Sequence, residues 1–118
     1  MVTDILRQLL PIPSPTFQEQ KKVAYIKQFL QENCMPGTLI EHDDNLIFQK
    51  EIDKQLPTIA LIGHSDVVPN HKLPIEKDGK LYGAGASDMQ AGLACFLSVL
   101  STLQEQLAYN VVLIVYAR

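Results

Sequence analysis

Two short, continuously apolar segments on either side of a helical pattern constrain the fold of this chain most strongly. They span residues 58–62 and 111–117, and neither alternates polar with apolar side chains. Strands that are covered on both faces have this pattern. Between them, residues 88–107 carry apolar side chains at helical spacing. Strand, helix and strand in this order predict a β-α-β unit with parallel strands and a right-handed crossover, and therefore an α/β fold.

The first half of the chain predicts three further elements. They are a short helix over residues 3–10, an amphipathic helix over 17–34, and a strand pair or bent strand over 38–49. Thr16, with Glu19 three residues later, has the spacing of a capping box, so we expect the second helix to begin there. His42, Asp43 and Asp44 imitate a metal cluster, but adjacent side chains in a turn point apart, and we interpret them as a turn.

The composition excludes several classes of function. Of the 118 residues, 47% are apolar and 19% are charged, which is typical of a globular core and too apolar for intrinsic disorder. The formal net charge is −3 and the sequence contains no basic patch. A protein that binds nucleic acid through its phosphates normally has the opposite charge. We therefore expect no nucleic-acid partner.

Membrane and secreted locations are not expected either. The longest apolar run, residues 111–117, is much shorter than the roughly 20 residues of a membrane-spanning helix. The N-terminal segment carries Asp4 and Arg7 and lacks the pattern of a secretory signal. Cys34 and Cys95 do not form a C-x-x-C pair, so we expect two thiols in a reducing cytosol. The sequence thus predicts a cytoplasmic protein.

A histidine and an aspartate follow the first apolar strand directly. In His64-Ser65-Asp66 the two outer side chains project to the same side of an extended backbone, so that imidazole and carboxylate can meet. A carboxylate that holds one ring nitrogen leaves the other nitrogen free to bind a metal ion. The alternative is a strand-end histidine that is hydrogen-bonded to a turn carboxylate for structural reasons alone.

A glycine-rich segment, Gly83-Ala84-Gly85-Ala86-Ser87-Asp88, opens the long helix. It lacks the third glycine of a dinucleotide-binding loop and has a carboxylate there, so nucleotide binding is not expected. Ser87 and Gln90 have capping-box spacing, which makes a purely structural helix start the alternative. The glycines, however, indicate a close approach between this loop and the strand.

The predicted topology brings the two motifs together. In open α/β sheets the functional loops lie beyond the carboxyl ends of the strands, where His64 lies, and the crossover helix begins at the same edge. We therefore expect Asp88 to face His64 across a cleft. One imidazole and two carboxylates suit zinc or a similar divalent ion.

Several motifs in one order resemble a known family. They are Gly63-His64-Ser65-Asp66-Val67-Val68-Pro69, the segment 79–89, the strand at 111–118, and Ile12-Pro13-Ser14 before the amphipathic helix. Together they resemble the zinc aminoacylase and metallopeptidase family, which includes succinyl-diaminopimelate desuccinylase, acetylornithine deacetylase and glutamate carboxypeptidase. The resemblance covers essentially the whole chain. It implies a three-layer α/β fold with a mostly parallel sheet flanked by helices.

The resemblance also implies roles for three side chains. His64 would bind one metal ion, Asp66 would be the catalytic-site carboxylate that orients it, and Asp88, followed by a cis peptide bond, would bridge two ions. The implied cofactors are two zinc ions, with cobalt as a substitute. The implied reaction is hydrolysis of an amide bond by a metal-activated water that a glutamate deprotonates. The implied substrate is a small N-acylated amino acid, in the first place N-succinyl-LL-2,6-diaminopimelate of lysine biosynthesis.

Two positions depart from the family's pattern and leave the substrate subgroup open. Ala84 stands where the family often has arginine, and Gln90 stands where it often has lysine. Acetylornithine deacetylase, or a dipeptidase or carboxypeptidase, is therefore the alternative within the same chemistry. Tyr82 is expected to pack rather than to catalyse, and His71 is expected to be a solvated turn residue.

The sequence ends at Arg118, where the family has two consecutive glutamates, a general base and a metal ligand. We therefore expect residues 1–118 to be the N-terminal part of the catalytic domain, without the inserted lid or dimerisation domain. By itself this chain should hydrolyse nothing, bind zinc weakly and self-associate, whereas the complete enzyme would be a homodimer. The alternative from another class is a non-catalytic remnant that acts as an interaction module.

Overall fold

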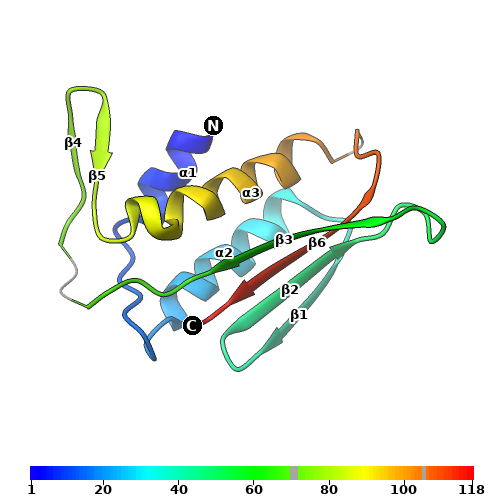
Figure 1. Ribbon diagram of the computed structural model, residues 1–118, viewed down its shortest axis with the longest axis horizontal. Coiled ribbons are helices and arrows are strands. Elements are labelled where there is room, and N and C mark those ends of the chain that lie inside the picture. Colours follow the sequence, from blue (N-terminus) through cyan, green and yellow to red (C-terminus); the bar gives the residue numbers. More distant parts are fainter. Residues whose placement is uncertain (70–71, 105) are drawn as a thin grey trace.

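A four-stranded sheet and three helices form the body of the molecule, and a small hairpin lies beside them (Figure 1). The computed structural model describes residues 1–69, 72–104 and 106–118. The elements in chain order are α1 (Val2–Leu9), α2 (Gln20–Asn33), β1 (Thr38–His42), β2 (Asn45–Lys50), β3 (Thr58–His64), β4 (Ile75–Lys77), β5 (Lys80–Tyr82), the π-helical segment η1 (Ala86–Gln90), α3 (Ala91–Thr102) and β6 (Asn110–Tyr116).

The predicted β-α-β unit and the α/β class are confirmed. Strands β3 and β6 pair in parallel, with His64 opposite Tyr116, and α3 connects them. The described sheet is mixed rather than mostly parallel, since β2 pairs antiparallel with both β1 and β6 in the order β1-β2-β6-β3. The reason for the β1–β2 pairing is local: Asp43 and Asp44 form a tight turn at positive φ (48° and 65°), and so short a link joins strands only in the antiparallel sense. The prediction of a turn at this point is confirmed.

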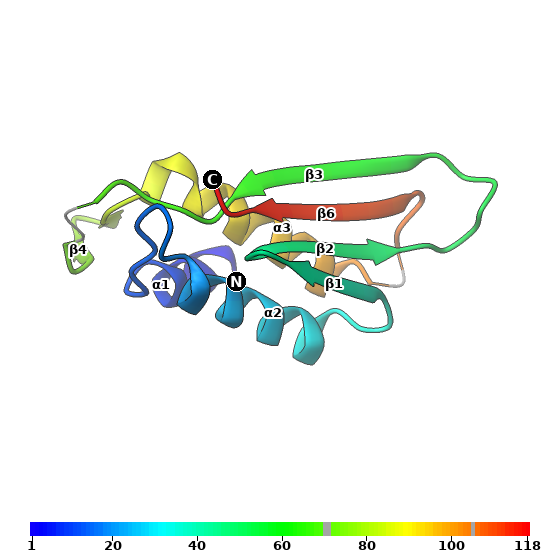
Figure 2. The ribbon, with the colours of Figure 1, turned by 90° about the horizontal axis from the view of Figure 1, so that it is seen from below.

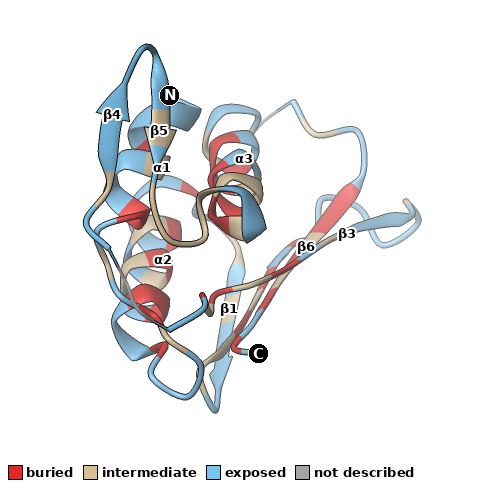
Figure 3. Cartoon of the chain, turned by 60° about the vertical axis from the view of Figure 1, so that its left-hand side comes forward, coloured by how far each residue is buried: buried red, intermediate tan, exposed pale blue. Residues whose placement is uncertain are grey.

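The three helices lie on one face of the sheet (Figure 2). Along β6 the side chains of Val111, Leu113 and Val115 are buried toward the helices, and the intervening residues are less buried. The strands were expected to be covered on both faces. In the described part of the chain the opposite face is open: burial alternates along β2 and most of β6, and the edge strands β1 and β3 are largely exposed (Figure 3). The register aligns four isoleucines there, one per strand: Ile40, Ile47, Ile114 and Ile62.

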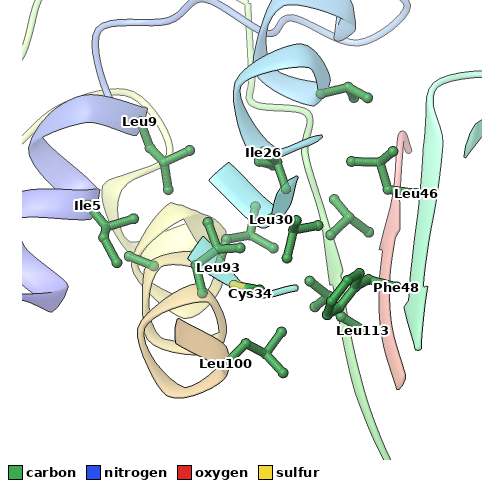
Figure 4. Close-up of a cluster of buried hydrophobic side chains, with 14 of the residues drawn as sticks. Ile5, Leu9, Ile26, Leu30, Cys34, Leu46, Phe48, Leu93, Leu100 and Leu113 are labelled. Carbon is green, nitrogen blue, oxygen red and sulfur yellow. The ribbon is translucent and has the colours of Figure 1, made fainter. Parts of the chain in front are cut away.

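The hydrophobic core fills the space between sheet and helices (Figure 4). Phe48 of β2 and Leu113 of β6 each expose 1% of their surface, and Leu30 of α2 is fully buried between the two layers. Burial of each such side chain stabilises the fold by about 2 kcal/mol. Helix α3 turns Leu93, Leu97 and Leu100 into this core, as its periodicity predicted.

The predicted capping box at Thr16 is wrong, and Ser87 of the alternative capping box caps neither η1 nor α3. Helix α2 begins at Gln20, and the hydroxyl of Thr16 bonds to Asp66 instead of capping the helix. Helix α3 begins at Ala91 and ends at Thr102, and its N-terminus has no side-chain cap. It starts later than the predicted residue 88 because Asp88 and Met89 have non-helical backbone angles, and it ends before the predicted residue 107.

None of the helices in the described ranges is sufficiently long and apolar to span a membrane. The two cysteines are free thiols in helical surroundings. Cys34, which is buried at the end of α2, has its thiol pKa raised to about 11 by burial, whereas Cys95 is exposed.

Candidate metal-binding site

The carboxyl end of β3 places an imidazole against a carboxylate, as the sequence predicted. His64 is the last residue of the strand, and Asp66 follows in the adjoining loop. The Nδ1 of His64 lies 2.9 Å from Oδ1 of Asp66 and 3.1 Å from its backbone oxygen. Both side chains are about one-fifth exposed, at 22% and 20%, so the pair is reachable from solvent. Asp66 thus fixes the orientation of the ring.

Asp88 reaches the other side of the same ring. Its Oδ1 lies 3.0 Å from Nε2 of His64, and its side chain is 88% exposed. The non-helical backbone of Asp88 and Met89 turns this carboxylate out of the helical pattern and toward β3, and the Asp88–Met89 peptide is cis, as the resemblance implied. The structure therefore brings all three sequence-predicted site residues together around one imidazole.

Two glycines allow the segments to approach so closely. A Cβ on Gly63 would lie 2.7 Å from Cε of Met89, whose sulfur accepts the His64 backbone N–H at 3.4 Å. Gly85 has a φ of +75°, and a Cβ there would lie 2.3 Å from Cγ1 of Val67. Both steric space and backbone conformation therefore require glycine at position 85. The predicted close approach of loop and strand is confirmed.

The segment before α2 also belongs to the site, and the sequence analysis missed this role. Ser14 accepts the Val67 N–H at 2.8 Å through its carbonyl and donates its hydroxyl to the Ser65 carbonyl at 2.8 Å. Thr16 Oγ1 donates to Oδ2 of Asp66 at 2.8 Å. The only signal in the sequence was the Ile12-Pro13-Ser14 motif, whose partners are distant in the chain.

The electrostatics of His64 follow from this enclosure. Burial lowers the pKa of its imidazole, but hydrogen bonds to Asp88 and Asp66 together with their charges outweigh burial, and the pKa is raised. A neutral imidazole has a single N–H and leaves one of two facing carboxylates without a donor. A cation is therefore favoured at this position, either a proton on the ring or a metal ion between Nε2 and Asp88.

The donor set fits a divalent metal ion. Two ligands of one tetrahedral zinc ion lie about 3.3 Å apart, close to the 3.0 Å between His64 Nε2 and Asp88 Oδ1. The second oxygen of Asp88 belongs to an exposed side chain and is available to a further ion. Within the described ranges no group of three or more His, Cys, Asp or Glu side chains is arranged to hold one ion. The described residues thus offer two side chains, His64 and Asp88, that could take part in holding such an ion.

Other residues singled out in the sequence lie elsewhere or contribute indirectly. His42 and Asp43 form an exposed pair at the β1–β2 turn, with 3.3 Å between Nε2 and Oδ2. The Tyr116 ring, at the end of β6, lies 5.8 Å from the His64 ring. Tyr82 is about half exposed in β5, and His71 lies outside the described residues.

Known proteins are similar to this chain in sequence and in fold. Residues 60–117 match the model of peptidase family M20/M25/M40. The chain is 32% identical to a succinyl-diaminopimelate desuccinylase of Corynebacterium glutamicum, over 95% of this chain and 31% of that protein.

Solved structures show the same fold. A tripeptidase of Staphylococcus aureus superposes with a TM-score of 0.76 and 25% identity, over 97% of this chain and 35% of that one. A Bacillus subtilis protein described as a dinuclear metal binding peptidase superposes with a TM-score of 0.68 and 19% identity, over 97% of this chain and 33% of that one. The chain spans about a third of the length of the proteins it matches.

Proposed function

This chain belongs to peptidase family M20/M25/M40, and from that premise we propose that it carries part of the active site of a metal-dependent amide hydrolase. One observation carries the proposal. The His64 imidazole is held between two carboxylates, with Asp66 at Nδ1 and Asp88 at Nε2. This is the arrangement of a metal-binding histidine whose remote ring nitrogen is fixed by a carboxylate.

The roles of the three side chains follow from their positions. His64 Nε2 and the Asp88 carboxylate would hold a zinc ion, and the second oxygen of Asp88 would hold another. Asp66 would accept a hydrogen bond from Nδ1–H, so that Nε2 is left as the metal-binding nitrogen. A zinc ion at this place supplies a Lewis acid that polarises an amide carbonyl and acidifies water. The dinuclear neighbour of the same fold supports the second ion.

The substrate we propose is an N-acylated amino acid, with N-succinyl-LL-2,6-diaminopimelate first. The support is the 32% identity to a desuccinylase, which covers nearly the whole of this chain. A small peptide is the second candidate, because a tripeptidase shares both the fold and 25% identity. We further propose that residues 1–118 form the N-terminal part of a catalytic domain, since relatives are about three times as long. A homodimeric, cytoplasmic complete enzyme is the part of this proposal that rests on the family resemblance of the sequence alone.

The metal site is tested by titrating the purified chain with Co²⁺ and recording its visible absorption. We expect binding weaker than roughly 1 µM, because a catalytic zinc takes three protein ligands and this chain offers two. His64→Gln and Asp88→Asn should each abolish the cobalt spectrum. His42→Gln is the matched control, since His42 lies exposed at a turn and should leave the titration unchanged. Equal cobalt spectra from all four proteins would refute the site.

The reaction is tested on the protein as its natural host produces it. With Zn²⁺ present we expect release of succinate from N-succinyl-LL-2,6-diaminopimelate, detected by mass spectrometry, and loss of this release with His64→Gln. N-acetylornithine and tripeptides are assayed in parallel to rank the substrates. Absence of hydrolysis for every one of these amides would contradict the proposed function.

A further inference from the structure

A buried lysine lies behind the metal-binding loop. Lys22 of α2 exposes 1% of its surface. Its ammonium donates to the Leu9 carbonyl at 2.7 Å and to Oε1 of Gln90 at 2.8 Å. Both acceptors are neutral oxygens, so the buried charge is compensated by directed hydrogen bonds at these atoms. Burial lowers the Lys22 pKa to about 8, which leaves the side chain largely charged at neutral pH.

Lys22 determines which way the Gln90 amide points. An ammonium can only donate, so the amide oxygen must face it and the amide NH₂ must face away. That NH₂ is directed at the Ser65 carbonyl, with Nε2 and oxygen 3.4 Å apart. Gln90 is completely buried, which leaves it no competing water in this orientation.

The Ser65 carbonyl lies in the backbone between His64, the proposed metal ligand, and Asp66, which orients the His64 ring. Ser65 connects His64 to Asp66, and its backbone N–H donates to the Tyr116 carbonyl at 3.0 Å. Its carbonyl also accepts the Ser14 hydroxyl at 2.8 Å. The backbone of Ser65 is therefore held at its N–H by β6 and at its carbonyl by Ser14 and Gln90.

Gln90 joins the two segments that carry the proposed ligands. It lies two residues after Asp88, at the junction of η1 and α3, and its side chain reaches the residue after His64. A displacement of the helix start relative to β3 would lengthen this contact together with the distance between His64 and Asp88.

We propose that Gln90, oriented by Lys22 and assisted by Ser14, is a positioning residue that sets the separation of His64 and Asp88. This inference rests on the proposed metal-dependent function and deepens it, because it assigns a task to three buried residues that touch neither ligand. Changes to residues that orient metal ligands typically weaken metal binding by 10- to 100-fold. We expect effects in that range.

The decisive variant is Gln90→Glu. A carboxylate keeps the contact with the Lys22 ammonium but turns an acceptor, instead of a donor, toward the Ser65 carbonyl. We expect Co²⁺ affinity to fall tenfold or more and the cobalt absorption bands to shift, with the midpoint of thermal unfolding close to wild type. Gln55→Glu is the charge-matched control, since Gln55 is exposed in the loop between β2 and β3.

Two further variants separate positioning from folding. Ser14→Ala removes the other side-chain donor to Ser65 and should also weaken Co²⁺ binding. Lys22→Met frees the Gln90 amide to rotate. If Lys22 acts only through Gln90, adding Lys22→Met to Gln90→Glu removes nothing further. The double variant should therefore lose no more Co²⁺ affinity than Gln90→Glu alone. Additive losses would mean that Lys22 does not act through Gln90, and they would overturn the inference.

A metal-free measurement distinguishes this inference from the proposed function. The carbonyl ¹³C resonance of Ser65 and the nuclear Overhauser effect between the His64 ring and the Asp88 side chain are recorded without metal. We expect Gln90→Glu to change both relative to Gln55→Glu. If the wild-type chain fails to bind Co²⁺, the metal site is refuted, while the positioning role is still decided by these two signals. Unchanged signals in Gln90→Glu would overturn the positioning role of Gln90.

Discussion

The Nε2 atom of His64 lies 3.0 Å from Oδ1 of Asp88, although one residue ends a strand and the other precedes a helix. The contact exists only after β3 has paired with β6 and α3 has packed against the sheet. Asp66 holds the opposite ring nitrogen at 2.9 Å. The geometry of the site is therefore a property of the folded β-α-β unit.

The first prediction concerns the pH dependence of stability without metal. The pKa of His64 is raised, so the native state binds a proton more tightly than the unfolded state. The contribution of His64 to stability should be fully present below the ordinary pKa of about 6.5 and disappear as pH rises through the raised value. Urea unfolding of wild type and His64→Gln between pH 5 and pH 9 should show the difference between them shrinking over this range. His42→Gln, which replaces an exposed histidine at the β1–β2 turn, is the control.

The second prediction concerns competition between a proton and a metal ion. Both require Nε2 of His64, so Co²⁺ affinity should rise as pH increases through the raised pKa. Below that pKa each bound ion should release about one proton from the ring. Calorimetric titrations in two buffers of different ionisation enthalpy measure the number of protons released per bound Co²⁺. A proton release that stays the same in Asp66→Asn and His64→Gln would contradict the assignment.

The third prediction concerns the glycine loop before Asp88. Gly85→Ala places a Cβ 2.3 Å from Val67 at a φ of +75°, and should cost about 3 kcal/mol through combined clash and strain. Gly79→Ala is the matched control, because Gly79 has a similar φ of +72° and open space around it. It should cost only about 1 kcal/mol. Equal costs in urea unfolding would show that the approach of Gly85 to Val67 is not tight.

The fourth prediction concerns the two faces of the sheet. Leu113 points toward the helices and is buried, with 1% of its surface exposed. Ile62 lies on the open face of the sheet and has 53% of its surface exposed. Leu113→Ala should lower the free energy of unfolding by about 3 kcal/mol, and Ile62→Ala by less than about 1 kcal/mol. Comparable losses for the two variants would indicate that the open face is covered in solution.

The fifth prediction concerns the buried ammonium. Its pKa is lowered to about 8, so between pH 8 and the ordinary value of 10.5 the unfolded state holds more protons than the native state. The free energy of unfolding of wild type relative to Lys22→Met should rise across this interval, by roughly 3 kcal/mol at most. The comparison with Lys22→Met is needed because the raised pKa of Cys34 acts in the opposite direction in both proteins. The measurement is urea unfolding of both proteins at pH 7.5, 9 and 10, and a constant difference between them would contradict the lowered pKa of a buried Lys22.

The periodic segments of the sequence predicted the main elements correctly. The apolar runs became β3 and β6, and the helical period became α3 with Leu93, Leu97 and Leu100 in the core. Hydrophobic spacing is a local signal, which is why it could be interpreted without tertiary information. The spacing of His64 and Asp66 was equally local, and it correctly predicted their contact.

Local patterns failed where a distant partner competed for the same side chain. Thr16 had the spacing of a helix cap, but its hydroxyl bonds to Asp66. Gln90 had the spacing of a capping box, yet its amide is used by Lys22 and Ser65. A side-chain donor or acceptor goes to the best buried partner, and that partner is defined only by the packed structure.

The sequence by itself determined the order of the main strands and helices and the class of fold, and it predicted which three side chains meet at the end of β3, because hydrophobic periodicity and motif spacing are encoded in neighbouring positions. Only the tertiary structure decided that the sheet is mixed, that the described helices pack on one of its faces, and that a lysine and a glutamine buried behind the site join its two halves. These features depend on contacts between residues far apart in the chain, and such contacts acquire their energies only when the chain is folded.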